Sequence, residues 1–216
     1  MKMPGSYFGS APILPAGAVP VLAGLNRDYL DLLLAGRREG ADVLGVSVMD
    51  ELAAATPAVL DSIAACSYAL FALDPSLALR AVDPGAPQVN DPVIARYGAG
   101  PKDAGAWTAF TTAALSFAWH LSRNSPIAAR VMLGFKLLTA DAMAAVDPWQ
   151  LRYIAAQQPA PLKPRWGENP CFWPDLVRCA CTQRSLELDL ARLLGLQLLA
   201  AEMRPGPQIV ERRRRS

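Results

Sequence analysis

The stretch LGFKLLTADAMAAVDPWQLRYIAA, residues 133–156, decides the fold class of this sequence. After an Ala-rich segment, Asp147 can cap a helix, Pro148 suits the first helical position, and Gln150 can bond back to the cap. Apolar residues then recur at helical spacing. The stretch therefore predicts short helices separated by tight turns, the general build of a helix-turn-helix.

A similar plan occurs earlier, in residues 44–65. Leu44-Gly45 precedes an Ala-rich helix and Thr56-Pro57, as Leu133-Gly134 precedes an Ala-rich helix and Asp147-Pro148. The apolar positions that follow also correspond: Leu60, Ile63, Ala64 and Ala65 match Leu151, Ile154, Ala155 and Ala156. The first copy is two residues shorter between its Gly and its Pro. We expect an internal duplication.

These motifs resemble FlhD, the helical subunit of the bacterial flagellar master transcription activator. The matching elements are Leu32-Leu33-Leu34-Ala35-Gly36-Arg37, Leu133-Gly134, Gln150-Leu151, Ile154-Ala155 and Pro164-Arg165-Trp166. The resemblance implies an α-helical protein that dimerises, joins a second subunit of the FlhC type and activates transcription from a promoter. A duplicated chain could form internally the dimer that a single-copy protein forms from two chains.

The sequence also departs from the FlhD pattern. That protein is shorter and single-copy, and the linker and the helices of residues 171–203 have no counterpart in it. Its cysteine near the end of the last matched helix corresponds to Phe71 in the first copy and Leu162 in the second. No analogous disulfide between subunits is therefore implied.

The whole chain is predicted to be all-α, because Ala and Leu dominate and β-branched residues are sparse. We expect two related multi-helix blocks joined by a Pro/Gly-rich linker, with a long C-terminal Leu-rich helix packed in the core or at a subunit contact. Asn26 is expected to cap the first helix. The predicted segments are a flexible Pro-rich leader (1–25), a first block (26–73), the linker (74–105), a second block (106–204) and a basic tail (205–216).

Charge is distributed unevenly along the 216 residues, although the net charge is only +2. Residues 1–100 carry six Lys/Arg against ten Asp/Glu, and residues 101–216 carry fifteen against nine. A basic second half suits an anionic partner such as promoter DNA. The residues predicted to contact nucleic acid are Arg123, Arg130, Lys136, Arg152, Lys163, Arg165, Arg212, Arg213, Arg214 and Arg215. An ordinary basic surface explains the same residues.

The alternative function is a helical adaptor of a bacterial secretion or flagellar apparatus, which acts through protein contacts alone. Charged residues make up only 19% of the chain, which leaves apolar surface for a partner. The residues predicted to bind a partner protein are Trp166, Phe172, Trp173, Leu190 and Leu194. Core packing accounts for the aromatic residues equally well.

We expect neither catalysis nor a bound cofactor. His120, the only histidine, has no adjacent nucleophile or orienting acid in evidence. Cys179 and Cys181 are two positions apart on a predicted helix and would face opposite ways, which disfavours a metal site. The four cysteines are expected to be free thiols in a reducing cytoplasm. Prolines interrupt the N-terminal apolar run, so neither a signal peptide nor a membrane span is expected.

Overall fold

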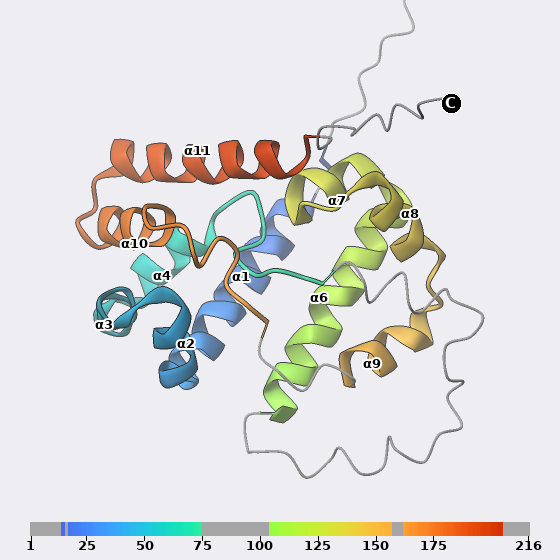
Figure 1. Cartoon of the computed structure of the whole chain (residues 1–216), viewed down its shortest axis with the longest axis horizontal. Helices are drawn as coiled ribbons and strands as arrows, with labels where there is room; N and C mark the ends of the chain where they lie inside the picture. The colour runs from blue at the N-terminus through green and yellow to red at the C-terminus, as the bar shows by residue number, and fades with distance from the viewer. Residues whose placement is uncertain (1–13, 16, 75–103, 157–161, 205–216) are drawn as a thin grey trace, which may run out of the picture.

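The protein is all-α, as predicted, in a computed structural model that describes residues 14–15, 17–74, 104–156 and 162–204 (Figure 1). The first four helices are α1 (Ala18–Ala35), α2 (Arg37–Leu44), α3 (Val46–Ala54) and α4 (Pro57–Ala64). The next four are α6 (Ala104–Asn124), α7 (Pro126–Leu133), α8 (Leu137–Ala145) and α9 (Pro148–Ala156). The last two are α10 (Phe172–Cys181) and α11 (Ser185–Glu202). None of the helices in these ranges is long and apolar enough to cross a membrane.

Helix starts agree with the capping signals in the sequence. The Thr56 side chain accepts a hydrogen bond from the backbone N–H of Val59 at 3.4 Å, and Ser125 accepts one from Ala128 at 3.2 Å. Before α9, the backbone N–H of Asp147 donates to Oε1 of Gln150 at 3.0 Å. The predicted return bond of Gln150 to its cap residue is thus confirmed, and each bond satisfies an amide that the first helical turn leaves unpaired.

The first helix corrects two predictions. It begins at Ala18, so residues 18–25 of the predicted flexible leader are helical. Pro20 is tolerated because it falls in the first turn, where a backbone N–H has no partner within the helix. Asn26 is not a cap but a buried residue inside α1, where its Nδ2 donates to the backbone oxygens of Ala64 at 3.1 Å and Tyr68 at 3.0 Å. The linker of residues 75–103 and the tail from residue 205 lie outside the described residues.

Two groups of four helices have the same order and the same packing. In each group the long helix, α1 or α6, contacts the three short helices that follow it, and the first two short helices contact each other. The two long helices also pack against each other near the centre of the molecule (Figure 1). Their contact includes an aromatic cluster in which the ring of Tyr29 lies 6.0 Å from Trp107 and 5.8 Å from Phe110.

An extended segment follows each group of four helices, and the two segments pair with each other. Phe71 and Pro164 form an antiparallel bridge. The N–H of Ala72 donates to the oxygen of Lys163 at 2.9 Å, and the N–H of Arg165 donates to that of Leu70 at 2.8 Å. Lys163 follows Ala72 by 91 positions, the same interval that separates Ile63 from Ile154. Ala72 and Lys163, which share one of these hydrogen bonds, are therefore equivalent positions in the two similar stretches. The origin of the two stretches by duplication stays a prediction.

Helices α10 and α11 cover one of the two groups. Helix α10 packs against α3 and α4, and α11 packs on α10 (Figure 1). Among the described residues, no further helix packs comparably against α8 and α9. The two C-terminal helices follow the second group in sequence, yet they lie over the first group in space. A continuous hydrophobic core runs through all of these elements.

Candidate functional site

The residues predicted to contact nucleic acid do not gather on one surface. Arg123, Lys136, Arg152 and Lys163 are exposed and Arg130 is half-buried. Arg123 lies in the last turn of α6, next to α7, and its guanidinium sits 5.0 Å from the ring centre of Trp119. Arg152 is on α9, which lies beside the opposite end of α6 (Figure 1). The residues from Arg212 to Arg215 fall outside the described residues.

The prediction for Arg165 is corrected, because this residue is buried and paired with Glu202 and does not lie on an exposed surface that could follow a DNA backbone. Only 6% of the residue is exposed. Its Nη2 lies 2.5 Å from Oε2 of Glu202, at the end of α11, and its guanidinium sits 4.6 Å from the ring centre of Trp166. Burial lowers the pKa of Arg165, and the hydrogen bond that the guanidinium donates to Glu202 acts in the opposite direction. The group is a buried cation that depends on Glu202 for its counter-charge.

Gly134 explains how the guanidinium fits. It ends α7 in the left-handed conformation, with φ of 73°. A Cβ atom at this position would lie 1.7 Å from Nη2 of Arg165, so no larger residue fits without moving the guanidinium. The motifs Leu133-Gly134 and Pro164-Arg165-Trp166, which carried the family resemblance, therefore meet in space. Both motifs belong to the pattern that resembles FlhD, and this shared membership is the sequence signal that could have indicated their contact.

Two of the aromatic residues predicted to bind a partner are core residues. Phe172 and Trp173 are fully buried, and Nε1 of Trp173 donates to the backbone oxygen of Arg165 at 2.8 Å. Core packing, the alternative left open by the sequence, is thus what the structure shows for both. Trp166 is half-buried, and its Nε1 donates to Oε1 of Glu202 at 2.6 Å.

Helix α11 has one face held to the body and one face turned outward. On the inner face, Tyr68 donates to the backbone oxygen of Arg192 at 3.0 Å. Gly195 allows this approach, because a Cβ there would lie 2.0 Å from the Tyr68 hydroxyl. On the outer face, Leu190 is 58% exposed and was predicted to bind a partner. Leu186 and Leu193, which are 74% and 47% exposed, belong to the same face and were missed.

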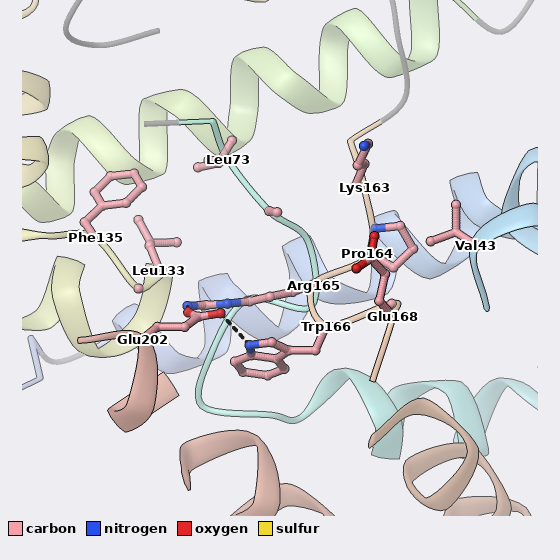
Figure 2. Close-up of a pocket in the computed structure, with 13 residues that line it drawn as sticks. Val43, Leu73, Leu133, Phe135, Lys163, Pro164, Arg165, Trp166, Glu168 and Glu202 are labelled. Atoms are coloured by element: carbon pink, nitrogen blue, oxygen red, sulfur yellow. Dashed lines mark hydrogen bonds and ion pairs between the residues drawn. The ribbon is translucent and has the colours of Figure 1, made fainter. Parts of the chain in front are cut away.

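A pocket of about 390 Å³ opens beside the Arg165–Glu202 pair (Figure 2). It lies between the turn after α7, the extended segment around residue 165 and the end of α11. Its charged lining residues are Lys163, Arg165, Glu168 and Glu202. Its apolar lining residues include Val43, Leu73, Leu133, Phe135 and Trp166. The volume falls within the range of small-molecule sites, roughly 300–1,000 Å³.

Among the described residues, the other reactive side chains form no recognisable catalytic or metal centre. His120 is exposed on α6, and Nδ2 of Asn124 lies 3.2 Å from its Nε2. The four cysteines are free thiols, two of them buried, and burial raises the pKa of Cys66. Within the described ranges, no group of three His, Cys, Asp or Glu residues could hold a metal ion.

Comparisons with protein-family models, curated proteins and solved structures give no match for this chain. The likeness to FlhD therefore stays a prediction from the motifs quoted above.

Proposed function

We propose that this chain is a non-enzymatic helical adaptor whose α11 binds an amphipathic helix of a partner protein. The observation that supports the proposal is the outward face of α11, which is apolar and exposed although the rest of the helix is anchored to the body. Exposed leucines that lie in register on one helix face are typical of a site for another protein rather than of free surface.

The outward face of α11 has the spacing of a coiled-coil seam. Its exposed positions follow one another at intervals of four, three, four and three residues: Leu186, Leu190, Leu193, Gln197 and Ala200. None of these residues is charged. A seam of this period presents a continuous stripe to a second helix, which packs its own side chains between the stripe's residues. The partner segment is therefore expected to be helical.

Charge next to the seam indicates the chemistry of that segment. Glu187 and Asp189 flank the leucines in the first two turns of α11, and both are exposed. Each is paired with an arginine of this chain, Glu187 with Arg184 and Asp189 with Arg192, and lysine or arginine beside the partner's apolar stripe would extend these pairs. A second copy of α11 would instead place acids at its own flanks. Three leucines also cover much less than the ~800 Å² per subunit that a stable complex buries. The partner must accordingly contact a longer part of this chain than the leucines alone.

The experiment compares two surface variants of the full chain in its native cells. Leu190→Ser combined with Leu193→Ser removes the centre of the seam, and Leu138→Ser removes an equally apolar exposed leucine on α8. We expect both proteins to keep the wild-type circular dichroism spectrum. The seam variant should lose a stoichiometric partner that wild type and Leu138→Ser both retain, at low and high salt alike, because apolar contacts resist screening. Equal retention by all three proteins would contradict the proposal.

A FlhD-like transcription regulator is the second candidate, favoured by the antiparallel pairing of the two extended segments, in which Ala72 bonds to Lys163. Such pairing suits a chain that forms an internal dimer from two related units. Sequencing the DNA that co-precipitates with the protein would test it. Discrete upstream regions, bound in a strongly salt-dependent manner and unaffected by the leucine substitutions, would favour the regulator over the adaptor.

A further inference from the structure

Arg165 and Trp166 together hold a carboxylate at two points. Oε2 of Glu202 lies 2.5 Å from Nη2 of Arg165, and Oε1 of the same group accepts a hydrogen bond from Nε1 of Trp166 at 2.6 Å (Figure 2). Each carboxylate oxygen therefore has its own donor. Two-point recognition with one charged donor is a strong and geometrically specific way to bind a carboxylate.

The site has more capacity to donate than Glu202 uses. Nη1 of Arg165 is buried and has no hydrogen-bond partner within the described part of the chain. Leaving a buried donor unpaired is costly, more so on a charged group. Lys163 lines the same pocket and is exposed. An oxygen that enters the pocket would therefore meet the exposed ammonium of Lys163 besides the donors that now hold Glu202, and Nη1 shows that the guanidinium is not saturated by Glu202.

Glu202 occupies this site from a partly exposed position at a helix end. It is the last residue of α11, and 42% of its side chain is exposed. Helix ends fray, and an exposed carboxylate recovers its hydration when it leaves. Arg165, by contrast, is fixed by Gly134 on one side and by Trp166 on the other. Arg165 is thus packed on two sides, whereas the carboxylate that it binds comes from an exposed helix end.

We infer that this pocket binds a monocarboxylate with an apolar body, whose carboxylate replaces that of Glu202 on Arg165 and Trp166. The apolar walls at Leu73, Leu133 and Phe135 would cover the body of the ligand. The two acids and two bases that line the pocket balance each other, so a single negative charge can take the place of the Glu202 carboxylate on Arg165, whereas Glu168 and Glu202 repel a phosphate dianion. The ligand is a free carboxylic acid or an Asp or Glu side chain of a peptide. This inference does not depend on the outward face of α11.

The test uses the ¹⁵N-labelled full chain and follows the indole N–H resonance of Trp166, assigned with Trp166→Phe. The probes are 3-phenylpropionate and its uncharged analogue 3-phenylpropionamide. We expect the acid to shift the resonance saturably with millimolar affinity, and the amide to leave it unchanged up to about 10 mM. Glu202→Gln removes the competing carboxylate and should tighten binding of the acid roughly tenfold.

Two further arms complete the experiment. Arg165→Lys loses the planar fork and should weaken binding at least about tenfold. If that variant does not fold, the comparison of wild type with Glu202→Gln decides alone, because Glu202 is on the surface. Acetylated Leu-Glu-Leu amide, compared with its Gln counterpart, distinguishes a peptide source from a free acid by which ligand binds more tightly. Equal shifts with acid and amide, or no shift in either wild type or Glu202→Gln, would overturn the inference.

Discussion

The two extended segments pair with each other, yet each is anchored to its own surroundings in a different way. Asn26 of α1 fixes the first segment, since its Oδ1 accepts from the N–H of Leu70 at 2.9 Å and its Nδ2 donates to the oxygen of Tyr68. The second segment is fixed by Arg165, which lies on Gly134 and pairs with Glu202. Asn26 is a neutral amide whose donors and acceptor are all hydrogen-bonded. Arg165 is a buried charge whose Nη1 has no hydrogen-bond partner among the described residues.

The comparison separates a structural anchor from a binding site. A buried amide whose donors and acceptor are all used has nothing left for a ligand, so its role ends with stability. A buried guanidinium beside a pocket, whose counter-charge is a partly exposed carboxylate, can exchange that carboxylate for another acceptor. The glycines that end α2 and α7 differ in the same way. Gly45 ends α2 with φ of 86° and open space around it, whereas Gly134 ends α7 against the guanidinium.

The largest effect is expected at the first anchor. Asn26→Leu removes three strong hydrogen bonds and leaves backbone groups of residues 64, 68 and 70 buried without partners. The free energy of unfolding should fall by about 3–5 kcal/mol. Urea unfolding followed by circular dichroism measures it, with Asp28→Ala on the exposed side of α1 as the control. A loss below about 1 kcal/mol would show that the amide is not the anchor.

The next largest effect is expected at Gly134, compared with Gly45, when each is replaced by alanine. Gly134→Ala must move Arg165 away from Glu202 and should cost about 2–4 kcal/mol, whereas Gly45→Ala meets only backbone strain of about 1–2 kcal/mol. A double-mutant cycle sharpens the comparison. In an Arg165→Met background the cost of Gly134→Ala should shrink by about 1 kcal/mol or more, while that of Gly45→Ala stays unchanged. Equal costs in both backgrounds would mean that Arg165 does not restrict Gly134.

Alkaline pH should lower the free energy of unfolding through the two buried tyrosines that contact the extended segments or belong to them. Burial raises the pKa of Tyr29, which donates to the backbone oxygen of Leu162 at 3.0 Å, and that of Tyr68, both above the usual 10. Above about pH 10 the unfolded chain loses these phenolic protons and the folded chain keeps them. Stability that is complete below this pH should then fall by up to about 1.4 kcal/mol per pH unit for each tyrosine. Unfolding curves of wild type and Tyr68→Phe near pH 9 and pH 11 test it, since the variant should lose less.

The smallest effect is expected inside α6. The hydroxyls of Thr111 and Ser122 are buried without hydrogen-bond partners among the described residues, unlike the amide of Asn26 in α1. Thr111→Val keeps the shape of the side chain and removes the unpaired group, so it should stabilise the protein by about 0.5–1 kcal/mol. The midpoint of thermal unfolding would report the gain. A clear loss of stability would reveal a partner for the hydroxyl and weaken the contrast between the two long helices.

Sequence reasoning succeeded where the signal is local. The Thr-Pro, Ser-Pro and Asp-Pro-Trp-Gln starts predicted the beginnings of α4, α7 and α9, because a cap needs only the residues of its own turn. It failed for Asn26, whose residue type suits a cap equally well. The partners of Asn26 lie about 40 positions away, and no local pattern announces them.

The candidate sites also divide into features that local sequence signals predict and features that tertiary packing decides. The sequence alone determined the helical class, most of the short helices and the presence of a Leu-rich last helix, since propensity, capping and period are properties of neighbouring residues. It did not predict α2, because Gly36 and Gly40 indicated a break there. Only the tertiary structure decided that Arg165 is buried against Gly134 and Glu202, and that leucines of α11 face outward. Which side of a helix turns inward depends on the shape of what it packs against, and a leucine-rich helix offers more than one side.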